Sequence, residues 1–397
     1  MNIQETIDRA LTSAGLNTQS GPMRGVTDTI RNALASAGLA VGPAGPAPAP
    51  ARAARADDNT IDVVAREVST PGAHPASAHP AEAHPDAVPA RGQFLLRSFS
   101  APAGSRAYKL YLPVQAIRSE ASPVGVLPLV VMLHGCTQSA DDFAAGTQMN
   151  RLADQHGFIV VYPEQAAGAN TSRCWNWFRA EDQLRGAGEP ALLAGLVQAV
   201  VAEYPVDPGR VYVAGLSAGA AMAVVLGETY PELFAAVGAH SGLPYAAAHD
   251  IPSAMAAMKG HGVMGRGHLP GTPEDPRRQA TQAVPVIVFH GDRDHTVQLS
   301  NGEHIAQQAV RALAARTVGL TTTTEQGQVP GGRRYTRTRH TSAQGQCLVE
   351  SWTLHGAGHA WSGGDAAGSY TDRNGPDASA EMLRFFLAQP ARRAGTH

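Results

Sequence analysis

The chain has 397 residues, of which 43% are hydrophobic and 16% are charged, and its formal net charge is -2. This length allows one large α/β domain and an appendage. The near-neutral charge argues against a nucleic-acid partner held by electrostatics. The sequence also lacks an apolar run long enough to predict a transmembrane helix.

Residues 1–40 contain an internal repeat. The stretch ETIDRALTSAGL at 5–16 returns as DTIRNALASAGL at 28–39, with apolar residues at helical spacing and a closing Ala-Gly in each copy. We expect two short amphipathic helices that form a helical hairpin or an arm for self-association. An anchor to the surface of a polymer or granule is the alternative interpretation.

Residues 41–92 are rich in Ala and Pro and poor in large apolar side chains. Such a segment cannot bury a core and is predicted to be a disordered linker. It contains three Ala-His-Pro repeats, at His74, His79 and His84. A solvated Pro-rich repeat explains these histidines better than a metal site, and the sequence predicts neither a metal nor a cofactor.

Residues 93–390 alternate between apolar strands and helices, which predicts an α/β domain with a mostly parallel sheet covered by helices on both faces. Residues 94–96 and 107–112 are expected to form an antiparallel edge pair, and residues 246–283 an irregular insertion. The other predicted strands are 127–133, 158–162, 210–214, 234–240, 284–289 and 347–354, and the predicted helices are 141–155, 189–204, 218–229 and 302–315.

The stretch VAGLSAGAAM, residues 213–222, places Ser217 between Gly215 and Gly219, after a predicted strand and before a predicted helix. A strand that runs straight into a helix holds the residue at the bend in a strained conformation. Glycines two positions before and after it remove side chains that would clash there. The pattern predicts a serine oxygen exposed at the end of the strand, beside the positive end of the helix dipole.

Two further strand ends carry polar residues. Asp292 and Asp294 follow one strand, and His355 and His359 follow the last one. The chain order Ser, Asp, His is the order expected for a serine on a strand–helix elbow. A serine hydroxyl needs a base that titrates near neutrality, and the base needs a carboxylate that fixes its tautomer.

Five ordered motifs together resemble the esterase family of polyhydroxybutyrate depolymerases. They are LHGCTQ at 133–138, VYPEQ at 161–165, CWNWF at 174–178, GLSAGAAM at 215–222 and GHAWSGG at 358–364. This family is related to feruloyl and acetylxylan esterases, and the resemblance implies an α/β-hydrolase fold over roughly residues 93–388. Ala220 stands where the family pattern has a further glycine.

The resemblance implies that Ser217 is the nucleophile and His359 the base, and its spacing favours Asp294 over Asp292 as the acid. His355 is expected to have a structural role. The N–H groups of Ala218 and Cys136 are the expected oxyanion donors, because one follows the nucleophile and the other lies on the loop after a neighbouring strand.

The family motifs also place Cys136 and Cys174 on loops near the predicted site, where a disulfide and two buried free thiols are both open. Trp361 and Trp175 are predicted to contact the substrate, because an amphipathic ring offers apolar surface and one donor. The predicted function is a serine esterase that cleaves poly(3-hydroxybutyrate) or its oligomers through an acyl-enzyme.

A feruloyl or acetylxylan type of carbohydrate esterase is the alternative function. A non-catalytic polymer-binding or granule-binding protein is the alternative from a different class. The first residues show no ordinary signal peptide, so the cytoplasm is the default location. An extracellular location, as in many members of the family that the chain resembles, is the alternative.

Overall fold

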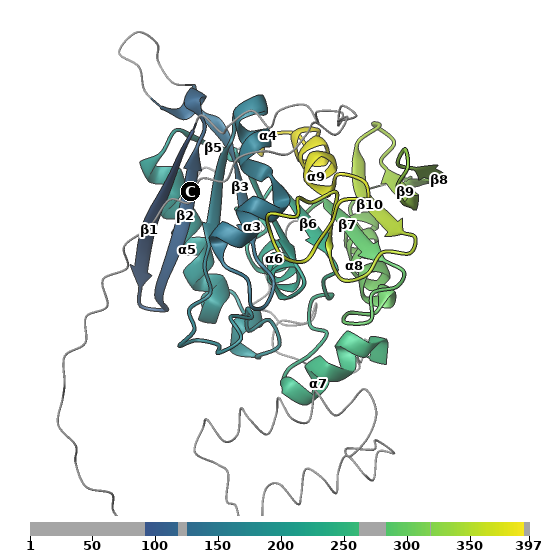
Figure 1. Cartoon of the computed structure of the whole chain (residues 1–397), viewed down its shortest axis with the longest axis horizontal. Coiled ribbons are helices and arrows are strands. Elements are labelled where there is room, and N and C mark those ends of the chain that lie inside the picture. The colour runs from purple at the N-terminus through teal and green to yellow at the C-terminus, as the bar shows by residue number, and fades with distance from the viewer. Residues whose placement is uncertain (1–91, 118–124, 262–282, 318, 393–397) are drawn as a thin grey trace, which may run out of the picture. The chain divides into compact units, whose positions relative to one another are not determined.

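The computed structural model describes residues 92–117, 125–261, 283–317 and 319–392 (Figure 1). The predicted repeat at 1–40 and all but the last residue of the predicted linker at 41–92 lie outside the described residues. Self-association through the repeat therefore stays a prediction. Within the described ranges, no helix is both long and apolar enough to cross a bilayer.

The described elements alternate between strands and helices along the chain. The strands are β1 (Gln93–Ala101), β2 (Gly104–Leu112), β3 (Leu127–Leu133), β4 (Ile159–Pro163), β5 (Val206–Leu216), β6 (Ala236–His240), β7 (Val286–Gly291), β8 (Thr321–Gln328), β9 (Arg334–Thr341), β10 (Cys347–Leu354), β11 (Trp361–Ser362) and β12 (Thr371–Asp372). The α-helices are α3 (Ala140–Thr147), α4 (Met149–His156), α5 (Gly188–Glu203), α6 (Ala218–Thr229), α7 (Ile251–Ala256), α8 (Leu299–Ala314) and α9 (Ala378–Leu387). Shorter helical turns are η1 (Val114–Ala116), η2 (Glu181–Gln183) and η3 (Ala257–His261).

One large sheet organises this part of the chain. Its strand order is β1-β2-β4-β3-β5-β6-β7-β10-β9-β8. The strands from β4 to β10 in that order pair in parallel, and antiparallel strands extend the sheet at both ends. The predicted parallel sheet and the predicted antiparallel edge pair are both confirmed.

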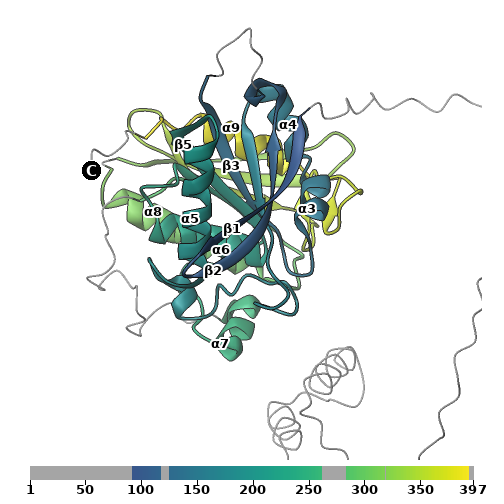
Figure 2. The same cartoon turned by 90° about the vertical axis from the view of Figure 1, so that its left-hand side faces the viewer.

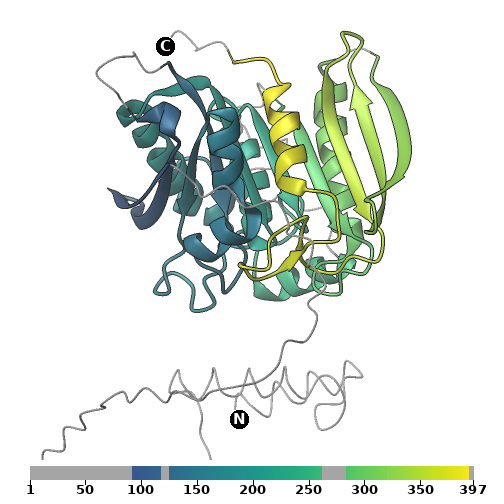
Figure 3. The same cartoon turned by 45° about the horizontal axis from the view of Figure 1, so that its top comes forward.

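Two hydrophobic cores cover the two faces of the sheet. Along β3, Leu129 and Val131 face the core that contains the apolar residues of α5, α6 and α8. Val130 and Met132 face the other core, which contains those of α3, α4 and α9. Successive side chains of a strand point to opposite faces, so a strand buried on both sides is a continuous apolar run. Figures 2 and 3 show the two helical layers.

Three segments differ from the sequence prediction. The helix predicted at 141–155 is two helices, because Gln148 adopts a left-handed conformation with φ of 55° between α3 and α4. Part of the predicted irregular insertion is the helix α7, which begins with a capping box between Asp250 and Ser253. The strands β8 and β9 were not predicted, because they show no apolar alternation: both are mostly polar, β8 is mostly exposed and β9 is half-buried.

Candidate active site

Ser217 lies at the bend between β5 and α6 with φ of 57° and ψ of -120°. This conformation is uncommon for a residue with a side chain and is held in place by the tight packing around it. A Cβ atom on Gly215 would lie 2.4 Å from the carbonyl carbon of Gly219, and one on Gly219 would lie 2.1 Å from the carbonyl oxygen of Leu133. The two glycines therefore allow the helix start to approach β5 and β3 directly.

Asp294 and His359 form a hydrogen-bonded pair at the carboxyl ends of the parallel strands, where Ser217 also lies. His359 Nδ1 lies 2.6 Å from Asp294 Oδ2, and the other carboxylate oxygen accepts the backbone N–H groups of Thr296 and Val297 at 2.9 Å each. The Asp294 side chain is fully buried and the His359 side chain is 13% exposed. Burial works to raise the pKa of Asp294, but the hydrogen bond and the charge of His359 outweigh it and hold that pKa below its usual value.

Asp292 and His355 form a separate pair. Asp292 Oδ2 lies 2.9 Å from His355 Nδ1, and Asp292 Oδ1 accepts the backbone N–H of Gly356 at 2.7 Å. Both side chains are 32% exposed, and His355 Nε2 lies 2.9 Å from the hydroxyl of Thr336 on β9. The structure thus divides the two aspartates and two histidines into a buried pair and a surface pair.

His240, at the end of β6, connects the serine bend to the loop that carries His359. Its backbone carbonyl accepts the N–H of Ser217 at 2.9 Å. Its ring Nε2 lies 3.0 Å from the backbone nitrogen of Ser362, three residues after His359, and therefore accepts that N–H. The sequence analysis did not identify His240, since a single histidine at the end of a predicted strand gives no signal for this contact.

The two expected oxyanion donors lie on segments that pack against each other. A Cβ on Gly219, next to Ala218, would lie 2.5 Å from the carbonyl oxygen of His134, so the start of α6 touches the loop that carries Cys136. Within that loop, Gly135 donates its N–H to the side chain of Gln138 at 2.9 Å. The backbone that presents the Cys136 N–H is therefore fixed from within the loop.

A disulfide joins Cys136 and Cys174, with their Cα atoms 4.2 Å apart. The same two loops share a second contact, because Thr137 donates its backbone N–H to the carbonyl of Ser172 at 2.7 Å. The sequence left a disulfide and two buried free thiols open, and the structure contains the disulfide. The disulfide attaches the loop with the expected oxyanion donor to the neighbouring loop.

Replacing both Cys136 and Cys174 by serine is expected to lower the free energy of unfolding by about 2–4 kcal/mol, because the bond closes a long loop in the unfolded chain. Urea unfolding of the double variant and the parent protein measures this loss. Cys347→Ser is the matched control, because Cys347 is the free cysteine of the described residues. A double variant as stable as the parent would show that the disulfide adds nothing to stability.

The prediction that Trp361 and Trp175 contact the substrate is corrected by their burial. Trp361 is 1% exposed and Trp175 is 0% exposed. Trp361 donates its indole N–H to Ser379 Oγ at 3.0 Å, and Trp175 donates to the carbonyl of His134 at 3.1 Å. Both rings pack inside the domain and hold loops near the site, so neither offers a surface to a bound molecule.

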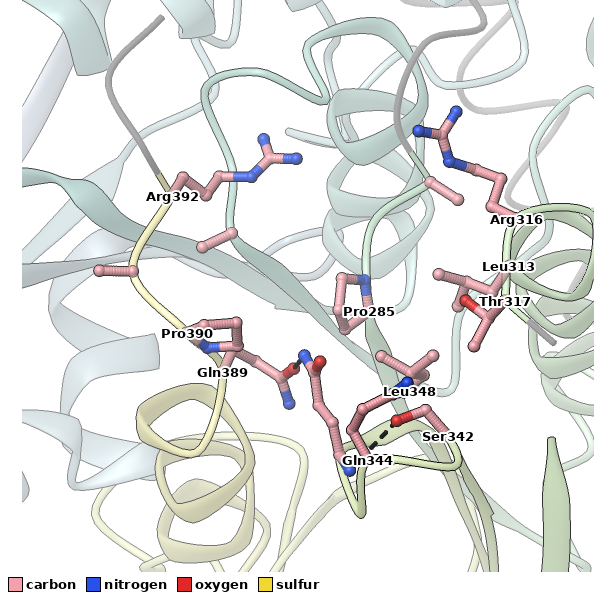
Figure 4. Close-up of a pocket in the computed structure, with 14 residues that line it drawn as sticks. Pro285, Leu313, Arg316, Thr317, Ser342, Gln344, Leu348, Gln389, Pro390 and Arg392 are labelled. Atoms are coloured by element: carbon pink, nitrogen blue, oxygen red, sulfur yellow. Dashed lines mark hydrogen bonds between the residues drawn. The ribbon is translucent and has the colours of Figure 1, made fainter. Parts of the chain in front are cut away.

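A cavity of about 360 Å³ lies at the amino ends of the parallel strands, at the other end of the sheet from Ser217 (Figure 4). Its lining includes Pro285 and Leu348, at the amino ends of β7 and β10, and the two arginines Arg316 and Arg392. Ligands of parallel sheets bind beyond the carboxyl ends of the strands, where Ser217 lies. This cavity is therefore not the cleft of the candidate active site.

Three histidines of this region are buried and held neutral. His134 and His240 are 0% exposed and His290 is 1% exposed. Burial lowers the pKa of all three, and that of His240 falls to about 3. Since His240 Nε2 accepts a backbone N–H, its proton must lie on Nδ1, which faces Ser241 Oγ at 3.2 Å.

The protein is expected to lose stability as the pH falls below about 6.5, the ordinary pKa of histidine. Below that pH the unfolded chain binds protons that the three buried histidines do not, so unfolding becomes easier. Between pH 7 and 5.5 this costs about 1 kcal/mol for His240, and the lowered pKa values of His134 and His290 add to the loss. Asp182 opposes it by about 1 kcal/mol, because burial raises its pKa to about 6. We therefore expect a net loss of stability toward pH 5.5.

Urea unfolding at pH 7, 6.5, 6 and 5.5 measures this loss. His249→Gln is the control, because the side chain of His249 is 54% exposed and its replacement should leave the slope unchanged. A free energy of unfolding that stayed constant or rose toward pH 5.5 would contradict the prediction.

The strained serine bend, with a His–Asp pair at the carboxyl edge of a mostly parallel sheet, defines an α/β-hydrolase fold. Comparison with known proteins agrees: the family described as Esterase PHB depolymerase matches residues 106–328. The chain belongs to this family.

The chain is similar to two curated bacterial enzymes. It is 35% identical over 240 residues to poly(3-hydroxyalkanoate) depolymerase C of Paucimonas lemoignei, a match that covers 58% of this chain and 54% of the relative. It is 31% identical over 261 residues to poly(3-hydroxybutyrate) depolymerase of Ralstonia pickettii, covering 61% and 50%. The chain thus spans about half the length of these relatives.

The chain is also similar to carbohydrate esterases. It is 34% identical over 178 residues to feruloyl esterase B of Neurospora crassa, covering 43% of this chain and 59% of the relative. Among solved structures, an acetyl xylan esterase from Aspergillus awamori superposes with a TM-score of 0.55 at 19% identity, covering 74% of this chain and 99% of that one. The structural likeness shows the fold alone.

Proposed function

We propose that the chain is a serine esterase that hydrolyses carboxylic esters through an acyl-enzyme. The observation that carries this proposal is the buried His359–Asp294 hydrogen bond at the sheet edge that also carries the strained Ser217. Because Asp294 accepts from His359 Nδ1, the lone pair of Nε2 is available as a base. This is the arrangement that activates a serine hydroxyl.

In the proposed reaction, Ser217 Oγ attacks the ester carbonyl carbon while His359 Nε2 takes the hydroxyl proton. The N–H groups of Cys136 and Ala218 stabilise the negative oxygen of the tetrahedral intermediate. The carbon–oxygen bond to the alcohol then breaks, and the alcohol leaves with the proton held by His359. Water, deprotonated by the same ring, attacks the acyl-enzyme and releases the acid and the free serine.

We propose short-chain poly(3-hydroxyalkanoate), poly(3-hydroxybutyrate) in particular, or its oligomers, as the substrate. The support is the similarity to the Paucimonas lemoignei and Ralstonia pickettii depolymerases. The similarity to a feruloyl esterase supports a second candidate, an ester of a plant polysaccharide. A non-catalytic polymer-binding protein would leave the strained Ser217 and the buried His359–Asp294 pair without a role.

A substrate panel tests these proposals. Initial rates are measured on methyl-capped 3-hydroxybutyrate trimer, methyl ferulate, acetylated xylo-oligosaccharide and amorphous polymer granules. We expect kcat/KM on the trimer to exceed that on the two carbohydrate-type esters by about tenfold or more, a difference of about 1.4 kcal/mol in transition-state binding. A faster rate on ferulate or acetyl esters would favour the second candidate. Granule binding without any turnover would favour the non-catalytic class.

A further inference from the structure

Tyr370 combines an exposed ring with an unusual backbone. It lies between β11 and β12, in the segment that joins His359 to α9, and is 48% exposed. Its φ is 51°, a left-handed value that is uncommon for a bulky residue. Such a conformation persists only where the surrounding contacts impose it, and it is found preferentially at functional sites.

One set of contacts holds Tyr370 to the loop of the proposed base. The backbone carbonyl of Tyr370 accepts the N–H of Trp361 at 2.7 Å. Trp361 is two residues after His359 and is fixed by burial of its own ring. The position of Tyr370 relative to the His359 loop is therefore fixed through the backbone.

A second set of contacts holds the same segment to helix α3 and to the loop of residues 134–138. This loop carries Cys136 and is called the oxyanion loop below. Ser369 donates to Asp142 through its N–H at 2.8 Å and through its hydroxyl at 2.6 Å. Asp142 also accepts from the amide of Gln138 at 2.8 Å. That same amide side chain accepts the N–H of Gly135. In Figure 1 the yellow segment between β10 and α9 runs alongside α3, as these bonds require.

The side chain of Tyr370 reaches the oxyanion loop through its hydroxyl. Its hydroxyl lies 3.3 Å from the hydroxyl of Thr137, which directly follows Cys136. Thr137 itself has φ of 67°. Two strained residues from distant parts of the sequence thus meet beside the expected oxyanion donor, with the aromatic ring open to solvent.

We propose that Tyr370 is a substrate-contact residue whose ring forms one wall of the cleft for the units of an ester chain that neighbour the scissile bond. The ring offers apolar surface to the aliphatic units of a hydroxyalkanoate chain. Its hydroxyl donates to Thr137 Oγ1, since Thr137 gives its own proton to the carbonyl of Cys136 at 2.6 Å. This inference rests on the proposed function. It differs from the sequence prediction, which assigned this task to Trp361 and Trp175.

The test compares a minimal and an extended substrate. In Tyr370→Ala and Tyr370→Gly, KM for 3-hydroxybutyrate trimer is expected to rise about five- to tenfold, the loss typical of one aromatic contact. For p-nitrophenyl acetate, which lacks the neighbouring hydroxyalkanoate units, kcat/KM should stay within about twofold. Tyr370→Phe keeps the ring and should stay within about threefold of the parent KM on the trimer.

The glycine variant separates contact from folding, because glycine adopts the left-handed backbone without strain. Its thermal stability should equal or exceed that of the alanine variant while its KM for the trimer is raised. Leu387→Ala is the matched control. Leu387 is an exposed residue at the end of α9, just before the segment that lines the cavity at the amino ends of the strands. This variant should leave KM for the trimer and kcat/KM for p-nitrophenyl acetate unchanged.

Two results would overturn the inference: an unchanged KM on the trimer, or an equal loss on both substrates, which would indicate support of the oxyanion loop instead. Wild-type turnover of the trimer is measured first and tests the proposed function by itself. If the wild type does not cleave the trimer, the same comparison is made with methyl ferulate as the extended ester. Failure of the function and failure of the Tyr370 contact are thus read from different measurements.

Discussion

Replacing Ser217 with alanine is expected to lower kcat for ester hydrolysis by about 10⁶-fold, the loss seen when the nucleophile of a Ser-His-Asp enzyme is removed. The physical reason is that no other hydroxyl is placed on the strained bend between β5 and α6. The measurement is the initial rate on p-nitrophenyl butyrate, with thermal unfolding of both proteins recorded in parallel. Alanine accepts the same backbone conformation as serine, so the melting temperature should be nearly unchanged.

Ser241→Ala is the matched control for this variant. Ser241 follows β6 at the same sheet edge, is 0% exposed and also has a positive φ, of 51°. Its hydroxyl contacts His240 Nδ1 at 3.2 Å, so its loss removes one hydrogen bond and no nucleophile. We expect a decrease in kcat of less than about tenfold. Equal turnover by wild type and Ser217→Ala would end the proposal of a serine esterase.

Replacing Asp294 with asparagine is expected to lower kcat by about 10⁴-fold. The asparagine oxygen must stay toward the backbone N–H groups of Thr296 and Val297, which Asp294 Oδ1 now satisfies. Its NH₂ group then faces His359 Nδ1 and forces the ring proton onto Nε2. In that tautomer His359 cannot take the proton of Ser217.

The surface pair supplies the matched control, because Asp292→Asn makes the same chemical change two residues earlier. Asp292 contacts His355, and both side chains are 32% exposed, so its loss should change kcat by less than about threefold. Steady-state kinetics on one ester substrate measures both variants. If Asp292→Asn instead gave the larger loss, the acid would be Asp292 and the base His355.

Much of the fold could be predicted from local sequence signals. The helix predicted at 218–229 is observed with the same limits as α6, and the last predicted parallel strand, 347–354, coincides with β10. Long apolar runs and glycine spacing reflect short-range sterics and burial on both sides, which leave a periodic signal. The strand β8 gives no such periodic signal, because its residues are mostly exposed and it is held by backbone pairing with β9.

The site was predictable to a lesser degree. The glycines around Ser217 act within a few residues of it, so the bend could be predicted from the sequence alone. Trp361 was assigned to the substrate because of its place in a motif, and the sequence could not show that its ring is buried against His240 and Phe143. Tyr370 lies in none of the sequence motifs. Its contacts with Thr137 and Trp361 form only when the chain folds, so no local pattern indicates them.

The sequence by itself determined which strand ends carry the serine, the aspartates and the histidines, because apolar runs and glycines encode strands and tight bends locally. The family spacing favoured Asp294 as the partner of His359, but only the tertiary structure showed the two pairs, Asp294 with His359 and Asp292 with His355. These partners are 65 and 63 residues apart and meet because β7 and β10 are neighbours in the sheet. Strand order is set by packing across the whole domain, and no local pattern of residues records it.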